Sequence, residues 1–395
     1  MPAKKKTAHN ISPDVKAIES KVIEHRRHVH MYPERGFQEV KTQQYVLDNL
    51  GKIGLKGKKI AKTGVVAVLK GKKEGKTILL RGDMDALPMT EETGLPYASR
   101  HPGTGHCCGH DSHVAMLLGV AEILSKRGLE KGNVKFCWQP AEEGDGGAAV
   151  MIAEGVLDDP KPDAAFALHC WSPMEIGNIG VADGPAMAAV DTFDMTIEGI
   201  GGHAAYPHTS IDPVLVGSHV VAALHTIVSR RLNPFHNAVM SICSVHGGTT
   251  FNIIPPEVKY QGTVRTFRED DRKLIPKAME EIMNGVARGM GGKARLEYKR
   301  LLPATINDLK MAAFARDVAA TIIGKNHVFA PEPSMGGEDF AYFLQKVPGA
   351  FMYIGAGNKE KGAVWPHHHP KFRIDEDAFV IGMELLVRIV NKFLS

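Results

Sequence analysis

The chain has 395 residues, enough for two or three compact domains at roughly 150 residues each. Its 48 lysine and arginine residues exceed its 44 aspartate and glutamate residues by only +4, which argues against a nucleic-acid partner or an acidic membrane surface. The apolar share of 44% is that of an ordinary soluble protein, and no apolar run approaches the about 18 residues that a membrane span needs.

The amino end and the cysteines bear on the compartment. Lys4, Lys5 and Lys6 are followed by no apolar segment, so we expect no secretory signal. Five cysteines cannot all pair in disulfides, and such sparse use in a long chain is typical of a reducing compartment. We therefore expect a cytoplasmic protein without a disulfide framework.

Helix and strand signals alternate through the first third of the chain, as in an α/β sheet with crossover helices. Ser12 before Pro13 predicts a helix start with Ser12 as the N-cap, and Pro33 predicts the end of that helical region. Another helix is expected over Val114–Lys126, between β-rich runs that we interpret as buried, mostly parallel strands. These runs are Val65–Leu69, Thr77–Leu80, Val134–Trp138 and Ala164–His169.

A second unit begins near Asp191, where polar and apolar residues alternate with the period of two typical of a sheet with one wet face. The elements that follow predict the order βαββαβ, which is the ferredoxin-like arrangement. They are a helix over Pro213–Arg231, strands over Ala238–His246 and Glu257–Thr266, a helix over Arg272–Met290 and a strand over Ala294–Lys299.

The α/β pattern resumes after about Asn307, with helices expected near Met311–Ile323 and over Glu376–Phe393. The second unit is thus predicted as an insertion into the first. We expect a discontinuous α/β domain of residues 1–188 and 304–395, with a mostly parallel sheet, and an inserted α+β domain of residues 189–303.

Side chains that can bind metals recur after the predicted strands, where a rigid sheet can position them. Each alone has an ordinary interpretation, because single histidines are usually hydrogen-bonded, adjacent glutamates are usually solvated and adjacent cysteines are usually buried. Their combination in one α/β unit predicts a metal site. The segments are Asp83–Asp85, His106–His113, Glu142–Glu143, His169 and His367–His369.

Mixed thiolate, imidazole and carboxylate ligands suit Zn²⁺, Mn²⁺, Co²⁺ or Ni²⁺ better than Mg²⁺ or Ca²⁺. The chain has no C-x-x-C pair, so we expect a catalytic rather than a structural site. More than four candidate ligands indicate two ions about 3.5–4 Å apart that share a water whose pKa falls toward ~7.

The adjacent residues Glu142 and Glu143 predict two different roles at the site, because the side chains of neighbouring residues point in different directions. One carboxylate can bind metal while the other acts as general base and then acid toward the shared water. The alternative has Cys108 as nucleophile with a histidine as base, and it leaves the glutamate pair without a role.

With these residues the sequence resembles the M20 metallopeptidases, and within them the amidohydrolase branch of hippurate hydrolases, N-acyl-amino-acid deacylases and plant auxin-conjugate hydrolases. The matching segments run in order over almost the whole chain, from near residue 27 to near residue 370. They are Arg27–His30 with Pro33–Glu34, Arg81–Pro88, Cys108–Asp111, Pro140–Gly144, Gly202–Ala205, Asn252–Pro255 and Gly336–Phe340.

The resemblance implies a site with two divalent ions, in which Cys108 bridges the ions and Glu142 is the general acid and base. In the peptidase branches a histidine ligand occupies the position of Asp83, whereas Asp83 and Asp85 would here be supporting residues. Asp85 or Asp111 would orient a ligand imidazole and fix its tautomer. The implied ligands are Cys108, His110, Glu143, His169 and His368.

The resemblance also implies that the inserted domain is a lid that pairs with its equivalent in a homodimer. His203 would extend to a neighbouring active site and stabilise the developing oxyanion, with a hydrogen bond within a turn as the simpler alternative. Asn252 would support substrate binding. Arg265 would clamp the substrate carboxylate through its planar guanidinium, with a salt bridge on the strand surface as the alternative.

Two departures from the family pattern bear on the site. The residue before the ligand cysteine, commonly alanine in this branch, is Cys107, which places a competing thiol beside the proposed bridge. The usual Leu-His-x-Pro becomes His367–Pro370, and counting back two residues from the proline selects His368. A shift of the loop would select His367 or His369 instead.

We therefore predict a cytoplasmic metal-dependent hydrolase that cleaves an N-acyl amino acid into a carboxylic acid and a free amino acid. Benzoyl, acetyl and indole-acetyl groups are all compatible with the sequence. We expect no nucleic-acid or membrane partner, and a homodimer or higher homo-oligomer formed through the lid. The alternatives are a dipeptidase or aminopeptidase, and a metal-bound binding protein without turnover, against which the intact Glu142 weighs.

Overall fold

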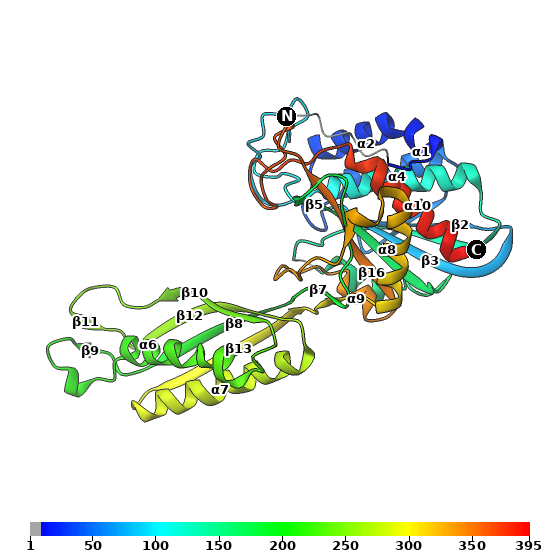
Figure 1. Cartoon of the computed structure of the whole chain (residues 1–395). Helices are drawn as coiled ribbons and strands as arrows, with labels where there is room; N and C mark the ends of the chain where they lie inside the picture. The colour runs from blue at the N-terminus through cyan, green and yellow to red at the C-terminus, as the bar shows by residue number, and fades with distance from the viewer. Residues whose placement is uncertain (1–8, 145) are drawn as a thin grey trace, which may run out of the picture. The chain divides into compact units, whose positions relative to one another are not determined.

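In the computed structural model, which describes residues 9–144 and 146–395, the chain forms two compact units. Unit 1 contains the described residues up to Ala186 together with Ile306–Glu332 and Asp339–Ser395. Unit 2 contains Met187–Thr305 and Pro333–Glu338, most of it green to yellow in Figure 1. The second unit is therefore an insertion between segments of the first.

Unit 1 is built on an eight-stranded sheet. Its strands are β1 (Gly57–Ile60), β2 (Gly64–Lys70), β3 (Lys73–Asp83), β4 (Lys131–Gln139), β5 (Ala164–Glu175), β6 (Ile179–Gly180), β15 (Val328–Phe329) and β16 (Gly349–Gly357). They lie in the order β1-β2-β4-β3-β5-β16-β6-β15. The central strands β4, β3, β5 and β16 are parallel, which confirms the mostly parallel sheet, but β2 runs antiparallel to β4.

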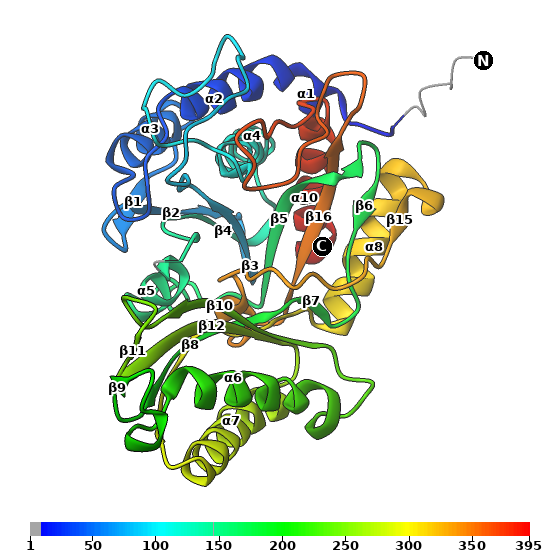
Figure 2. The ribbon, with the colours of Figure 1, turned by 90° about the vertical axis from the view of Figure 1, so that its left-hand side faces the viewer.

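The helices of unit 1 cover this sheet. They are α1 (Pro13–Ala17), α2 (Glu19–Met31), α3 (Val40–Lys52), α4 (His110–Arg127), α5 (Gly147–Ala153), α8 (Leu309–Ile323), α9 (Ala341–Leu344) and α10 (Ala378–Leu394). Helices α4 and α10 pack on central strands and on each other (Figure 2). Every residue of α4 from His110 to Leu124 is buried, so this helix is fixed on all sides. In the described part of the chain, none of the helices is long and apolar enough to span a membrane.

The first helical region differs from the prediction at its start. The helix is divided at Ile18 into α1 and α2, and the Ser12 side chain makes no cap hydrogen bond. Instead, the Ser12 hydroxyl donates to Glu384 Oε1 at 2.8 Å and its backbone N–H donates to Glu384 Oε2 at 3.0 Å. A buried carboxylate on α10 thus replaces the local cap. The region ends at Met31, shortly before Pro33, as expected.

Unit 2 is an antiparallel sheet with two long helices. Its main elements are β8 (Ala189–Glu198), α6 (Pro213–Leu224), β10 (Ala238–His246), β12 (Glu257–Thr266), α7 (Glu269–Gly289) and β13 (Lys293–Leu302). The strand order β10-β12-β8-β13 and the chain order βαββαβ confirm the ferredoxin-like arrangement. Helix α6 ends at Leu224 rather than at Arg231, because Ile227–Arg231 form a separate π-helical turn. A short pair, β9 (Gly202–His203) with β11 (Ile253–Ile254), completes the unit.

Candidate metal centre

The side chains predicted to bind metal converge at the carboxyl edge of the parallel strands in unit 1. Strand β3 ends at Asp83, which is paired with Gln139 at the end of β4. Strand β5 presents His169 opposite Tyr353 of β16. In parallel α/β sheets this edge is where ligands bind, because the loops that follow the strands meet there.

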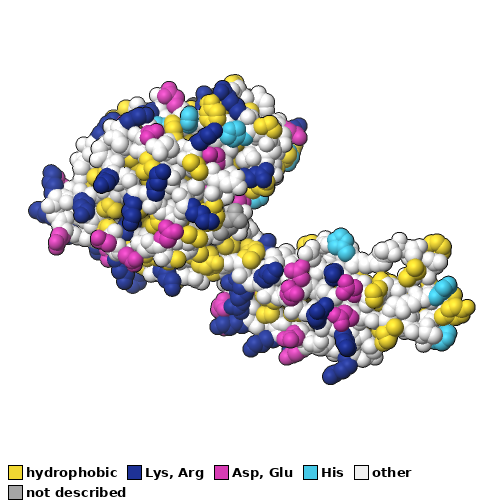
Figure 3. Space-filling view, turned by 180° about the vertical axis from the view of Figure 1, so that it is seen from behind, with side chains coloured by type: hydrophobic (Ala, Val, Ile, Leu, Met, Phe, Trp, Pro, Cys, Tyr) yellow, Lys and Arg dark blue, Asp and Glu magenta, His cyan; other side chains and the backbone are white. Residues whose placement is uncertain are grey.

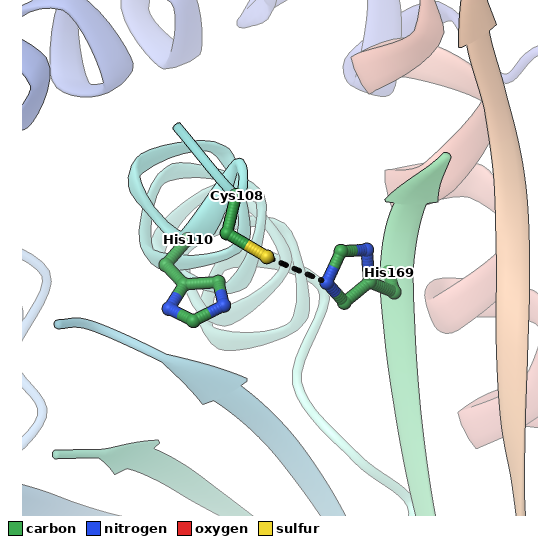
Figure 4. A group of neighbouring side chains, drawn as sticks. All are labelled: Cys108, His110 and His169. Carbon is green, nitrogen blue, oxygen red and sulfur yellow. Dashed lines mark hydrogen bonds between the residues drawn. The ribbon is translucent and has the colours of Figure 1, made fainter. Parts of the chain in front are cut away.

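Cys108 and His110 come to this edge at the start of α4. Gly109 between them has φ of +96°, a left-handed conformation that side chains other than glycine rarely adopt. Figure 4 shows both side chains beside His169 of β5. The Cys108 Sγ lies 3.6 Å from His169 Nε2.

Two groups of metal-competent atoms share Cys108, and within each group the atoms lie within 4.8 Å of one another. The first contains Cys108, His110 and His169, and the second contains Cys108, Glu143 and His368. Together they include all five ligands implied by the family resemblance, and a thiolate common to both is the arrangement of a bridging ligand. Glu142 belongs to neither group but lies with His110 and Glu143 in a third.

Two buried atoms at this site lack hydrogen-bond partners among the described residues, namely His110 Nε2 and Glu143 Oε1. They are 3.8 Å apart, too far for a hydrogen bond to each other. A separate cation beside each atom, at about 2.0–2.2 Å, would satisfy it. The donor set of thiolate, imidazole and carboxylate therefore fits a borderline divalent ion.

Burial and neighbouring charges shift the pKa values of the candidate ligands. Burial raises the pKa of the Cys108 thiol well above its usual range and lowers the pKa of His169 well below its usual range. Burial is the largest influence on His110 and opposes its charge, but Asp83, Cys108 and Asp85 together outweigh it and raise the pKa of His110. A metal ligand must be a thiolate or a neutral imidazole, so ion binding has to displace protons from Cys108 and His110.

Of the two carboxylates predicted to orient a ligand imidazole, Asp85 is the one that contacts His110. His110 Nδ1 lies 3.0 Å from the Asp85 carbonyl oxygen and 3.3 Å from Asp85 Oδ1, which leaves Nε2 toward the site. Asp85 Oδ2 also accepts the Glu143 backbone N–H at 2.9 Å. Asp111, the other candidate, instead accepts from Arg26 Nε at 2.6 Å and pairs with His30 Nδ1 at 2.8 Å.

Asp83 is held by a histidine that the sequence analysis left without a role. His113 Nδ1 lies 2.5 Å from Asp83 Oδ1, and His113 Nε2 accepts the Cys170 N–H at 2.9 Å. Both ring nitrogens are engaged, so His113 supports Asp83 rather than binding an ion. In the sequence, the position of His113 three residues after His110 indicates that the two side chains lie on the same face of one helix.

The three consecutive histidines have different surroundings. His368 Nε2 lies 3.3 Å from Glu143 Oε1, and this ion pair raises the pKa of His368. His367 Nε2 donates to the Cys170 carbonyl at 2.9 Å, while the His369 ring stacks on Trp365 with centroids 4.1 Å apart. Among these three, His368 alone belongs to a metal-competent group of the described residues.

Cys107, the departure beside the ligand cysteine, is buried and belongs to no such group among the described residues. Burial raises the pKa of its thiol to about 12, so the thiolate needed for metal binding is disfavoured. Its backbone carbonyl accepts the His368 N–H at 2.9 Å. Cys107 thus anchors the loop that carries His368.

The remaining predicted residues lie in unit 2. His203 is exposed, and its Nδ1 accepts the Ala205 N–H at 3.1 Å. Asn252 is exposed and accepts the Ala204 N–H through its carbonyl at 3.1 Å. Arg265 on β12 donates to the Thr263 hydroxyl and to the Val264 carbonyl, and no carboxylate of the described residues forms an ion pair with it.

Comparisons with known proteins match nearly the whole chain. A model of the peptidase family M20/M25/M40 matches residues 79–392. N-acetylcysteine deacetylase of Bacillus subtilis (strain 168) is 40% identical over 377 residues, which are 95% of this chain and 97% of that protein. N-acyl-L-amino acid amidohydrolase of Geobacillus stearothermophilus is 44% identical over 297 residues, 74% of this chain and 80% of that protein. A crystal structure from Bacillus subtilis, described as a dinuclear metal-binding peptidase of the M20 family, is 35% identical with a TM-score of 0.84, covering 96% of this chain and 99% of that chain.

The substitution His368→Ala should lower the divalent metal bound per chain to about half, because one of two ion positions loses a ligand. His369→Ala is the matched control and should keep the wild-type content, since its ring stacks on Trp365. Both proteins would be loaded with Zn²⁺ or Mn²⁺, desalted and measured by inductively coupled plasma mass spectrometry. Equal metal content in the two variants would contradict the assignment of His368.

Proposed function

Because the chain belongs to the peptidase family M20/M25/M40, we propose that it hydrolyses the amide bond of N-acyl-L-amino acids, releasing a carboxylic acid and a free amino acid. The observation that carries this proposal is the pair of ligand groups that share Cys108, with Glu142 beside them and outside both. The names of two similar proteins, a deacetylase and an amidohydrolase, support the substrate class. The family itself makes the protein a hydrolase of amide bonds.

Two divalent cations fit the ligand groups. One would be held by Cys108, His110 and His169, and the other by Cys108, Glu143 and His368. When bound, Zn²⁺, Mn²⁺, Co²⁺ or Ni²⁺ would polarise the scissile carbonyl and lower the pKa of a coordinated water toward ~7. The chain's own residues then have to orient the substrate and move the protons.

Glu142 is the general base and then the general acid of this proposal. Its side chain is only 8% exposed, its Oε1 accepts the Asp339 N–H at 3.2 Å, and its Oε2 lies 3.9 Å from His110 Nε2. Positive φ angles of +55° at Ala141 and +118° at Gly144 shape the turn, so that Glu142 and Glu143 have different partners. A proton taken up by Glu142 can be delivered to the leaving amine.

The substitution Glu142→Gln should keep the bound metal and lower kcat by about 10²–10⁴-fold or more, because the amide cannot accept the proton. Glu143→Gln is the informative contrast, since it should lose metal as well as activity. Steady-state kinetics and metal content would be measured on the same samples. Near-normal turnover of metal-loaded Glu142→Gln would rule out the assigned role.

Substrate recognition is assigned to unit 2. Because His203 Nδ1 accepts the Ala205 N–H, the proton of the neutral ring is on Nε2, which can donate to a developing oxyanion. Arg265, with no carboxylate partner among the described residues, keeps guanidinium donors for the substrate carboxylate. Asn252 stays as a further substrate contact.

We propose that the chain forms a homodimer through unit 2, so that His203 serves the active site of the neighbouring subunit. Unit 2 has an edge strand, β10, and a concentration of large apolar side chains exposed to solvent (Figure 3). A cluster of exposed apolar side chains is typical of an interaction surface. These side chains are Ile200, Tyr206, Val214, Leu215, Phe235, Val245, Phe251 and Ile253.

Complementation tests this arrangement. Co-expression of Glu142→Gln and His203→Ala chains should recover about a quarter of the wild-type activity, because half the dimers are mixed and one of their two sites has both residues intact. Each parent alone should be nearly inactive, and His208→Ala, an exposed neighbour, should be fully active. A mixture no more active than its parents, or a monomer in analytical ultracentrifugation, would contradict the shared site.

The substrate class is tested on metal-stripped protein reloaded with single ions. N-acetyl, N-benzoyl and N-indole-acetyl amino acids should be hydrolysed with kcat/KM at least about 10-fold above that of the matching free dipeptides, whose ammonium lacks a dedicated partner. A chelator should abolish the activity. Preference for dipeptides would indicate a peptidase, and no hydrolysis with any ion would indicate a metal-bound binding protein.

The location that we propose is the cytoplasm. All five cysteines are free in the structure. A reducing compartment would keep Cys108 available as the thiolate that the ligand groups require.

A further inference from the structure

The described residues of the segment that carries Glu142 and Glu143, 140–144 and 146, form neither helix nor strand, and carboxylates from outside the segment accept two of their backbone N–H groups. It connects the end of β4 at Gln139 with the start of α5 at Gly147. Ala141 has φ of +55°, a conformation that costs a side-chain-bearing residue about 1–3 kcal/mol unless its surroundings impose it. The groups that impose this backbone therefore determine where the Glu142 carboxylate lies.

Asp339 contacts both ends of this segment. Its Oδ1 accepts from Gln139 Nε2 at 2.7 Å, and its Oδ2 accepts the Ala148 backbone N–H at 3.0 Å. Its own backbone N–H donates to Glu142 Oε1 at 3.2 Å. The side chain of Asp339 is fully buried, so water does not compete for these bonds.

A buried arginine connects this support to the metal ligands. Arg81 Nη2 donates to Asp339 Oδ1 at 3.0 Å, and Arg81 Nε donates to Gln139 Oε1 at 2.9 Å. A third bond joins Arg81 Nη1 to Asp83 Oδ2. The same Asp83 oxygen lies 3.7 Å from His110 Nε2. The Arg81 guanidinium therefore contacts both Asp339, which supports Glu142, and Asp83, which lies near the proposed ligand His110.

We propose that Asp339 is a positioning residue for hydrolysis, which acts through Glu142 while its carboxylate oxygens accept from Gln139, Arg81 and Ala148. The Asp339 carboxylate holds Gln139 and Ala148 on either side of Glu142, and its N–H fixes one oxygen of Glu142 while the other faces His110. This inference rests on the proposed function, because it presupposes that Glu142 carries the proton. The simpler alternative is a buried ion pair that contributes only to stability.

The substitution Asp339→Asn separates the two interpretations, because an amide group cannot accept from every donor that the carboxylate serves. The metal-loaded variant should lose about 10- to 100-fold in kcat with KM within about 3-fold of wild type and unchanged metal content. Glu384→Gln is the matched control. Glu384 is also fully buried in unit 1 and accepts from Ser12 and Arg388, away from the site. It should lower the midpoint of thermal unfolding and leave kcat unchanged.

The double variant Asp339→Asn with Glu142→Gln identifies the route of the effect. If Asp339 acts through Glu142, its substitution should not further lower the residual rate of Glu142→Gln, so the two losses do not multiply. Multiplying losses, or a wild-type kcat in folded Asp339→Asn, would overturn the positioning role while the proposed function stands. Normal turnover of Glu142→Gln would instead reject the proposed function.

A second variant keeps the test valid if Asp339→Asn does not fold. Gln139→Met keeps the side-chain volume but removes one donor to the Asp339 carboxylate. It should lower kcat in the same direction and by a smaller factor, again with metal content unchanged. A folded Gln139→Met enzyme with wild-type kcat would contradict the inference.

Discussion

The central constraint on this molecule is that charges buried at one edge of the unit-1 sheet must be paired, because an unpaired ion in a protein interior is strongly destabilising. The Arg81 guanidinium pairs with Asp83 and Asp339, and five acidic side chains lie at this edge in all. They are Asp83, Asp85, Glu142, Glu143 and Asp339. The excess of acidic groups, together with the Cys108 thiol, favours cations. The excess of buried negative charge that destabilises this edge also makes it suited to bind divalent metal ions.

The sheet explains why these groups can be brought together with precision. Strands β3, β4 and β5 are parallel and buried, so the segments that follow them begin at one edge from fixed positions. Helix α4 is packed on all sides, which fixes Cys108 and His110 against His169. Loops alone would not hold five ligands within ångströms of their partners.

Features of the fold that follow from local patterns could be predicted from the sequence. The strands over Ala238–His246 and Glu257–Thr266 have the bounds expected, and Glu143 follows a strand as predicted. His169, expected at the end of its strand, instead lies within β5, which continues to Glu175. Features that depend on distant contacts could not be predicted. The Ser12 hydroxyl donates to Glu384, which lies 372 positions away in the sequence. The fold also decides between Asp85 and Asp111, because the end of β3 places Asp85 against His110 and α4 places Asp111 against Arg26. The Gly336–Phe340 segment was recognised as a motif, but Asp339 acquired a role only when the fold placed it beside Gln139.

The adjacency of Glu142 and Glu143 sets the final requirement of the site. Two consecutive carboxylates in a regular strand or helix diverge in a way that the element fixes, whereas the proposed function needs one that faces the ion positions and one that is held beside them for proton transfer. The left-handed residue Ala141 and the following Gly144 replace the regular backbone, and the described residues of this segment form neither helix nor strand. Its order must come from buried partners such as Asp339, Asp85 and Glu39, each of which accepts a backbone N–H from it or from its flank. Under the proposed function, metal binding and proton transfer are therefore kept apart by carboxylates that take part in neither step.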